Sequence, residues 1–335
     1  MPMKSLFQPT GSKRAHPARR YRASLLHPLR TFGLIVLLLF TLSASAAAQG
    51  SFFYPFSPSA LQHDLPAVIG SSTTYTIKKK DTLLDIARDF DLGFNEVRRL
   101  YPELDTWMPA AGMDITIPRM WILPDFVPNQ ERSEVVINLA EMRLFLFDYK
   151  QELIRSYPVG IGHADTPTPT GSFLIREKVV NPVWTIPEEL RGKYQVSQIP
   201  AGKNNPLGEY WLGLGDSDYG IHGTNLAWSV GRTSTNGCIR LYPEDISRAF
   251  RLLDYETRVS IVYQPVKFGW KNGELLVEVH PDVYDRIEDL AAYAYRLLQK
   301  KDLLDEADMN KLRVALERQS GQPVSIASTR RTAKK

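Results

Sequence analysis

Short apolar runs recur through the middle of the chain, separated by Gly and Pro. They are rich in β-branched and aromatic residues, which favour strands over helices. Strands are predicted at 135–139, 143–147, 153–159, 171–175, 210–214 and 259–263. A hairpin turn fits 148–151, and Pro243 in a first helical turn predicts a helix over 243–254. This pattern predicts a mainly β domain over 134–264, built as a β-sandwich, a barrel or a mixed β fold.

The apolar spacing becomes helical in the segment before this domain, 73–118. A helix is predicted over 81–90 with Asp81 as its N-cap, and a second helix starts at Asn95 as N-cap. The inward face of the first helix carries Leu83, Ile86, Ala87 and Phe90. Strands are expected on either side of the two helices. The segment is therefore predicted to be a small α+β (βααβ) unit.

The regions flanking these two units differ from them in composition and in the spacing of apolar residues. Residues 49–72 carry scattered Pro and Gly without a sustained period, which is typical of a linker. Residues 265–281 are expected to add a trailing strand region to the β domain, and 282–320 to form C-terminal helices. One helix is predicted to carry Ile287, Leu290, Ala291, Ala294, Leu297 and Leu298 on one face, and a second to cover 303–316. Residues 321–335 are predicted to be a basic, disordered tail.

Residues 1–48 have the three parts of a secretory signal peptide. Seven Lys or Arg residues and no Asp or Glu precede the apolar stretch 32–42, and small residues follow it at 43–48. An uncleaved N-terminal anchor is the alternative. Because the net charge of the whole chain is only +4, the remainder is mildly acidic. Its charge therefore gives no reason to expect a nucleic-acid partner.

Cys238 is the only cysteine of the sequence. An exported chain with one Cys makes no internal disulfide, and a spare thiol is a liability in an oxidising compartment. A buried Cys acting as a small hydrophobe is the ordinary interpretation. The neighbours of Cys238 favour a reactive thiol instead.

His222 and Cys238 lie sixteen residues apart, a separation that lets the intervening loop fold back and join them. A thiol is a weak nucleophile until an adjacent imidazole takes its proton, which leaves a thiolate–imidazolium pair. Gly237 allows the backbone to approach a substrate closely. We expect the amides of Gly237 and Cys238 to point at a developing oxyanion when the loop brings the two residues together.

The segments 222–224 (His-Gly-Thr) and 235–240 (Thr-Asn-Gly-Cys-Ile-Arg) resemble the active-site motif of the L,D-transpeptidases, which have the YkuD-type catalytic domain. Further blocks resembling the family follow the same order at 166–173, 178–184, 205–212 and 279–281. Many members carry His immediately before the motif Gly. This chain has Asn236 there, which leaves His222 as the nearby base.

The resemblance implies a cysteine acyltransferase of peptidoglycan. Cys238 would attack the amide before the terminal D-Ala of a tetrapeptide stem and form a thioester, which an amine of a second chain resolves. His222 would move the proton, with the Gly223 carbonyl orienting its imidazole. Arg240 would either anchor the loop or bind a substrate carboxylate. The expected pocket residues are Thr224, Thr235, Asn236, Tyr219 and Trp184, with core packing the alternative for the two aromatic side chains.

The segment 73–118 resembles a LysM domain, a module that binds N-acetylglucosamine-containing glycans. The residues that carry the likeness are Tyr75-Thr-Ile77, Asp81-Thr-Leu83, Ile86, Ala87, Phe90 and Gly112 to Pro118. It departs from the usual pattern at Lys80, where a Gly is common, and near Tyr101. Both departures lie in loops expected to hold sugar. A small structural domain that binds nothing is the alternative.

Three functions stay open at this point: a transpeptidase, an L,D-carboxypeptidase or other hydrolase on the same scaffold, and a non-catalytic wall-binding protein. The expected partners are peptidoglycan stems and glycan strands in the periplasm. For a transpeptidase, the acceptor is either a diaminopimelate amine or the lysine of an outer-membrane lipoprotein. No spacing of His, Cys and carboxylates predicts a metal site, and no phosphate loop predicts a cofactor.

Overall fold

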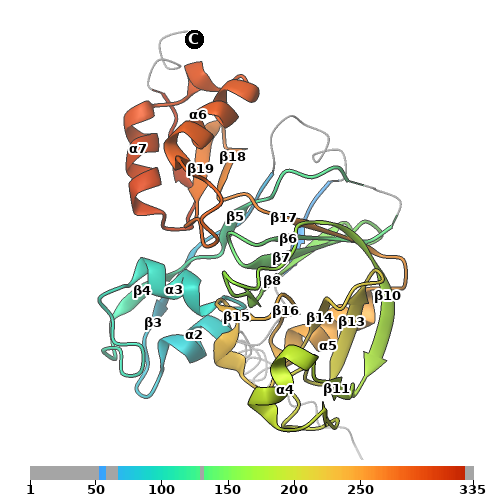
Figure 1. Cartoon of the computed structure of the whole chain (residues 1–335). Helices are drawn as coiled ribbons and strands as arrows, with labels where there is room; N and C mark the ends of the chain where they lie inside the picture. The colour runs from blue at the N-terminus through green and yellow to red at the C-terminus, as the bar shows by residue number, and fades with distance from the viewer. Residues whose placement is uncertain (1–52, 58–66, 129–131, 329–335) are drawn as a thin grey trace, which may run out of the picture. The chain divides into compact units, whose positions relative to one another are not determined.

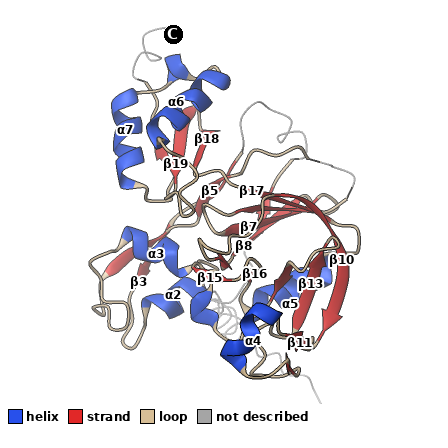
Figure 2. Cartoon of the chain, in the orientation of Figure 1, coloured by secondary structure: helices blue, strands red, loops and turns tan. Residues whose placement is uncertain are grey.

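A computed structural model describes residues 53–57, 67–128 and 132–328, so the predicted signal peptide lies outside the described residues. Its main feature is a nine-stranded mixed sheet with the order β1-β8-β7-β6-β17-β10-β13-β14-β16 (Figures 1 and 2). The strands are β1 (Phe53–Pro55), β6 (Glu134–Asn138), β7 (Arg143–Asp148), β8 (Leu153–Pro158), β10 (Gly171–Val180), β13 (Tyr210–Leu214), β14 (Gly220–His222), β16 (Ile239–Arg240) and β17 (Arg258–Val262). All six strands expected from the sequence are present. The mainly β prediction is confirmed.

Strand β10 joins the two halves of this sheet. Its first part, Gly171–Leu174, pairs with β17, and its second part, from Ile175, pairs with β13, with a shift in register between Ile175 and Glu177. The sheet curls around a core formed by Val135, Leu144, Ile175, Leu212, Ile221, Ile239 and Val259. Helix α5 (Pro243–Leu252) adds Ile246 and Ala249 to this core and starts at Pro243 as expected. One curled sheet thus takes the place of two facing sheets.

The central strands are buried on both faces, which explains their nearly continuous apolar sequence. Leu144 and Leu146 of β7 belong to the inner core, whereas Phe145 and Phe147 point to a second core on the other face. The alternation follows from the two-residue period of a strand. The second core is shared with the segment predicted as a βααβ unit.

That unit has the expected element order: β3 (Thr73–Thr76), α2 (Leu83–Asp89), α3 (Phe94–Leu100) and β4 (Asp114–Ile117), with β3 and β4 antiparallel. Its apolar residues Leu83, Ile86, Val97, Ile115 and Ile117 pack in one cluster with Phe145, Phe147 and Ile154 of the large sheet. The unit is folded against the β domain and has no core of its own.

Both helix starts in this unit were predicted at the wrong residue. Thr82 caps α2, because its hydroxyl accepts from the Asp85 amide at 3.0 Å; Asp81 instead accepts from the Lys78 amide. Gly93 caps α3, where the Glu96 carboxylate accepts from the Gly93 amide at 2.7 Å.

The segment predicted as a linker contains two strands. Strand β1 pairs with β8, and β2 (Val68–Gly70) pairs with β5 (Met120–Ile122). These strands were missed because each is only three residues long, too short to show a period.

The C-terminal region corrects another expectation. Strands β18 (Val266–Lys271), β19 (Glu274–Val279) and β20 (Val324–Ser325) form a separate sheet, so 265–281 does not extend the catalytic sheet and part of the predicted tail is a strand. Helices α6 (Leu290–Lys300) and α7 (Met309–Arg318) pack on it, joined by the 3-10 turn η3 (Leu304–Glu306). Ile287 precedes α6, because Asp289 caps that helix. Residues 329–335 lie outside the described ranges.

Short elements surround β14 and β16 at the end of the curled sheet. They are β9 (Ile161–Gly162), β11 (Trp184–Thr185), α4 (Glu188–Tyr194), β12 (Gln198–Ile199), the 3-10 turn η2 (Ala227–Ser229) and β15 (Thr233–Thr235). Strand β15 pairs with β9, and β11 with β12. Over the described ranges, no helix combines the length and apolarity needed to cross a bilayer.

A buried ion pair connects the βααβ unit to the sheet. The Arg143 guanidinium of β7 lies 2.6 Å from the Glu96 carboxylate of α3, and both side chains are buried. Arg143 also donates to the Asp91 carbonyl at 3.0 Å and stacks on Trp121 at 4.2 Å. Removing one partner of such a pair leaves an uncompensated charge in a medium of low polarity.

We expect Arg143→Met to lower the free energy of unfolding by about 3–5 kcal/mol, because it leaves Glu96 buried without its cation. Urea denaturation measures the change. The exposed pair formed by Arg313 and Glu317 provides the control, and Arg313→Gln should cost less than about 0.5 kcal/mol. Equal losses in the two variants would contradict the importance of the buried pair.

Candidate active site

Strand pairing brings the two chemical residues of the motif together. Strands β14 and β16 are parallel neighbours, with Ile221 opposite Ile239 and His222 opposite Arg240. Cys238 directly precedes β16, and the Gly220 amide of β14 hydrogen-bonds its thiol. Because side chains alternate along a strand, residues 238 and 240 share a face with 220 and 222. From ordinary strand spacings the Cα atoms of His222 and Cys238 are roughly 8 Å apart.

The Cys238 thiol sits at the surface of this end of the sheet and is half-buried. It donates to the Asp218 carbonyl oxygen at 3.7 Å. Burial raises the pKa of Cys238, while the Gly220 amide and the charge of Arg240 oppose this rise. The thiol therefore carries less thiolate at neutral pH than an ordinary cysteine.

His222 is buried and held at its other nitrogen. Its Nδ1 lies 2.6 Å from the Gly223 carbonyl oxygen, the contact expected from the family resemblance. Because a carbonyl oxygen only accepts, Nδ1 carries a proton and Nε2 of the neutral ring is an acceptor. Burial and the Arg240 charge lower the pKa of His222 to about 3, against the backbone contacts of Gly223 and Leu207. Both shifts favour the uncharged forms of the imidazole and the thiol over the expected thiolate–imidazolium pair.

Trp211 is a site residue that the sequence did not single out. It lies opposite His222 on β13, and the two rings stack with centroids 5.9 Å apart and 25° between their planes. Its indole nitrogen donates to Glu177 at 2.8 Å. A Cβ on Gly220 would fall 2.4 Å from the Trp211 ring. The sequence feature that pointed toward Trp211 was its place in the family-like block 205–212. Its stacking on His222 follows only from the strand register.

The turn before Cys238 is locked by Thr235 and Tyr219. The Thr235 hydroxyl donates to the Cys238 carbonyl at 2.6 Å and accepts from the Gly237 amide at 3.3 Å. Gly237 has a φ of +107°, and a Cβ there would lie 2.5 Å from the Tyr219 ring. Thr235 and Tyr219 thus shape the loop that presents the thiol, and the Gly237 amide is already engaged within it.

The remaining predicted pocket residues are placed around this centre. Thr224 is buried, and its hydroxyl accepts from the Leu226 amide at 2.9 Å. Asn236 is exposed. Trp184 packs edge-on against Tyr194 with ring centroids 5.1 Å apart, and the Tyr194 hydroxyl is close enough to influence Arg240. In Figure 1, α4 and β11 lie beside α5 at this end of the sheet.

Arg240 fixes the loop through its backbone and leaves its side chain available. Its amide and carbonyl pair with Gly160 at 2.9 and 2.7 Å. The buried Nε has no hydrogen-bond partner in the described structure. A guanidinium with an unused donor beside a thiol is suited to bind a carboxylate.

Comparisons with known proteins show the family of this chain. The YkuD family, the L,D-transpeptidase catalytic domain, matches residues 132–261. The probable L,D-transpeptidase ErfK/SrfK of Escherichia coli K12 is 32% identical, covering 88% of this chain and 96% of its own length. The chain belongs to the L,D-transpeptidase family. It is therefore an enzyme of this type.

Other similar proteins cover different shares of this L,D-transpeptidase chain. The probable L,D-transpeptidase YcfS of Escherichia coli K12 is 31% identical over 77% of this chain and 85% of its own length. The putative L,D-transpeptidase YkuD of Bacillus licheniformis is 33% identical over 56% of this chain and 97% of its own length. A crystal structure of an L,D-transpeptidase from Stackebrandtia nassauensis aligns with 54% of this chain and 67% of that chain, at 17% identity and a TM-score of 0.34.

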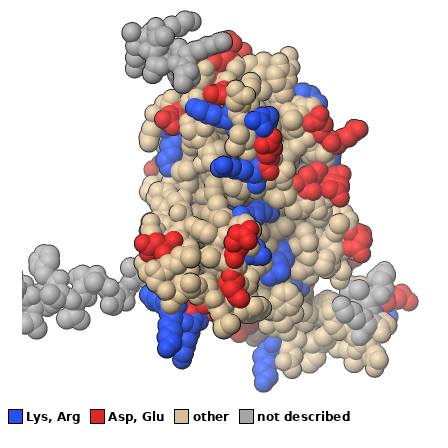
Figure 3. All heavy atoms as spheres, turned by 90° about the vertical axis from the view of Figure 1, so that its left-hand side faces the viewer, with Lys and Arg blue, Asp and Glu red and all other residues tan. Residues whose placement is uncertain are grey.

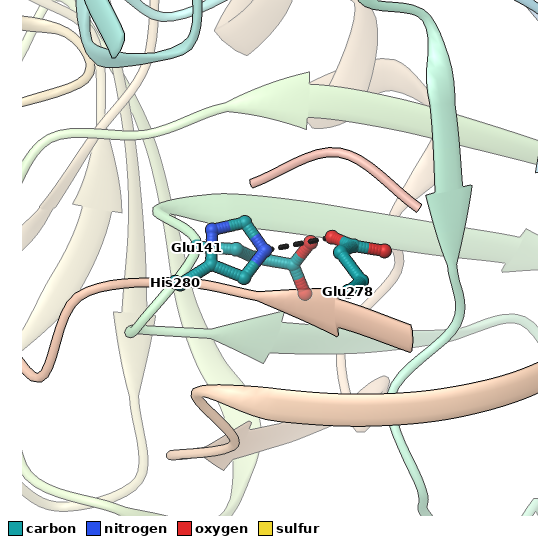
Figure 4. Close-up of side chains that lie close together, drawn as sticks. All are labelled: Glu141, Glu278 and His280. Carbon is teal, nitrogen blue, oxygen red and sulfur yellow. Dashed lines mark hydrogen bonds and ion pairs between the residues drawn. The ribbon is translucent and has the colours of Figure 1, made fainter. Parts of the chain in front are cut away.

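A second polar cluster of the enzyme lies away from the thiol. Glu141, Glu278 and His280 place their side chains within 4.8 Å of one another, and all are buried (Figure 4). The Lys267 ammonium lies 2.8 Å from Glu141 and 3.1 Å from Glu278. Since this ammonium already supplies the positive charge between the two carboxylates, the cluster is better suited to cross-link the two sheets than to hold a metal ion.

The neutral dyad makes a prediction for thiol titration. Because burial raises the pKa of Cys238 and lowers that of His222 to about 3, we expect no thiolate absorbance at 240 nm below about pH 8. Cys238→Ser provides the baseline, since the chain has one cysteine. Alkylation by iodoacetamide should accelerate only in alkaline buffer. Thiolate absorbance at pH 6 would show an ion pair instead.

Gly237→Ala should slow acylation of Cys238 about a hundredfold, because the new Cβ forces Tyr219 or the thiol loop to move. Gly273→Ala is the matched control: its φ is +79° and a Cβ there meets nothing within 4 Å. Each variant should lose about 1–2 kcal/mol of stability from the left-handed backbone, measured by denaturation. Equal acylation rates in both would show that the Tyr219 contact does not position the thiol.

Proposed function

We propose that this protein is a peptidoglycan L,D-transpeptidase with Cys238 as its nucleophile and His222 as its general base. The observation that carries the proposal is the parallel register of β14 and β16, which puts thiol and imidazole on one face. The thiol is half-buried and so remains accessible. No other cysteine competes for the role, since the sequence has only one.

The first half-reaction starts from the neutral dyad. As Sγ attacks the carbonyl carbon of the L–D amide, His222 Nε2 takes the thiol proton. The S–C bond forms, the C–N bond breaks, and Nε2–H returns the proton to the departing amine of D-Ala. The imidazolium is transient, and the Nδ1–H bond to the Gly223 carbonyl stabilises it at 2.6 Å. The product is a thioester on Cys238.

In the second half-reaction, an amine of another stem attacks the thioester. His222 accepts the amine proton and Cys238 leaves as the thiol, so the dyad returns to its starting state. Water in place of the amine gives hydrolysis by the same steps. Whether an amine or water reaches the open side of the thioester thus decides between transfer and hydrolysis.

Backbone amides of the thiol loop are proposed to stabilise the oxyanion. The Cys238 amide is one donor. The Gly237 amide is the second, after it gives up its 3.3 Å bond to Thr235. One such donor contributes roughly 2.7–4 kcal/mol to the transition state.

The pocket is proposed to hold the donor stem through Arg240. The unpartnered Nε of Arg240 favours binding of a substrate carboxylate, because the backbone of the residue already anchors the loop. Asn236, Thr224 and Trp184 would line the remaining walls. Trp211 would keep the imidazole plane fixed through the stacking described above.

We further propose export to the periplasm through the signal peptide 1–48 and glycan binding by the LysM-like unit 73–118. Relatives named L,D-transpeptidases and the βααβ element order support these two assignments. The amine acceptor is a diaminopimelate or a lipoprotein lysine. Binding of the Cys238→Ala protein to isolated sacculi tests the glycan role, and a protein that stays in solution would remove it.

The nucleophile is tested with a purified tetrapeptide donor and mass spectrometry of the intact protein. Wild type should gain the mass of the stem minus D-Ala, and Cys238→Ala should gain nothing. His222→Ala should slow acylation by about 10²–10⁴-fold. His163→Ala, in an exposed turn, is the matched control and should retain the wild-type rate. Acylation of Cys238→Ala would end the proposal.

Muropeptides from cells with and without the protein separate transfer from hydrolysis. Cross-links between two diaminopimelates, or lysine-linked peptides, identify the transferase and its acceptor. Shortened stems without new links would identify a hydrolase.

A further inference from the structure

An open groove of about 600 Å³ lies between helix α3 and the loop that leads to the thiol. Arg98 and Arg99 line one wall, and Arg232 and Thr233 line the other. Neither Cys238 nor His222 lines it. In Figure 3, which shows the face on the left of Figure 1, Lys and Arg side chains lie along the middle of the surface with Asp and Glu side chains among them. We call this site the arginine groove.

The three guanidiniums of the arginine groove have no carboxylate partner among the described residues. Arg98 donates to backbone carbonyls, including those of Tyr101 and Leu104, and Arg99 donates to His280 Nδ1 at 3.3 Å. Arg232 stacks on the Phe94 ring at 4.1 Å. These contacts orient the three side chains without neutralising them. Clustered cations held in this way favour an anionic ligand.

A buried amide in the same groove also lacks a partner. Neither the oxygen nor the nitrogen of the Asn95 side chain has a hydrogen-bond partner, although both atoms are buried. Asn95 lines the groove beside Gly231. A buried polar group without a partner is destabilising. Because solvent does not reach either atom, a ligand in the open groove satisfies this amide once the side chain turns toward it, and the amide then offers a donor and an acceptor to a peptide.

The arginine groove is connected to the active site by a short rigid segment. The backbones of Gly93 and Gly231 approach so closely that a Cβ on Gly231 would fall 2.7 Å from the Gly93 Cα. Strand β15 runs from Thr233 to Thr235, which holds the Cys238 carbonyl. Five residues of extended chain span at most about 17 Å, so the groove wall lies within that distance of the thiol.

We propose that the arginine groove binds a second peptidoglycan stem peptide through its carboxylates, outside the thiol site. The inference rests on the proposed function, because that function requires two stems to meet near Cys238. A stem is an extended peptide with several carboxylates and small apolar side chains. The guanidiniums can bind the carboxylates, and Phe94, Pro102 and Met142 offer apolar surface for the small apolar side chains. The volume is in the range of ordinary ligand sites.

The test uses the full-length Cys238→Ala protein, which retains the groove but forms no thioester. Isolated tetrapeptide is added, and amide hydrogen exchange is followed over residues 94–102, which contain α3 and lie outside the thiol site. The expected result is slower exchange there, together with binding measured by calorimetry. Arg232→Gln should weaken this binding at least tenfold, because a hydrogen bond to a charged group is lost. Arg232→Lys should retain part of it.

Two controls make the result specific. Arg313→Gln removes an exposed charge on α7 and should leave affinity and protection unchanged. Inorganic phosphate at the same concentration should give weaker protection than the peptide. Peptide binding without protection of 94–102, or equal protection by phosphate, would overturn the proposal. Acylation of the wild-type thiol by tetrapeptide is measured separately, so failure of the groove is distinguishable from failure of the catalytic assignment.

Discussion

The parallel pairing of β14 with β16 is the constraint on which the chemistry depends. Two strands of three and two residues hold His222 beside Arg240 and Cys238 beside Gly220. A slip of one residue would turn the thiol to the opposite face, because side chains alternate. Ile221 and Ile239 are fully buried in the core of the curled sheet, which fixes the register. The apolar core therefore positions the polar site.

Burial decides how the dyad works. In water the pKa of an imidazole is about 6.5 and that of a thiol is about 8.5, so a proton passes readily between the two groups. Here the low polarity of the site favours the uncharged form of each group. In the mechanism we propose, charge separates only during the reaction, and the Gly223 carbonyl and the loop amides stabilise the two charges. Such an arrangement protects a lone thiol from oxidation, since thiolate is the form that oxidants attack.

Much of this could be predicted from residues alone, and the failures have physical causes. The motif around Cys238 and the strands of the sheet have strong local patterns, and both were found. Trp211 was missed because its contact with His222 comes from pairing between strands. Helix caps were misplaced by one or two residues because Thr82 and Gly93 compete with equally good neighbours. The region 265–281 was expected to trail the β domain, but its two strands pair with each other in a separate sheet, because sequence shows that a strand exists but not which neighbour it pairs with.

The βααβ unit and the curled sheet share one apolar core, and this limits how the chain can be divided. The gap between the two predicted units, from residue 118 to residue 134, separates segments whose side chains pack in one cluster. A chain starting there would expose Phe145, Phe147 and the buried charge of Arg143 to solvent. Recombination that exchanged this N-terminal unit for another would need a replacement with matching shape and a carboxylate in the place of Glu96. The two parts are thus expected to unfold together.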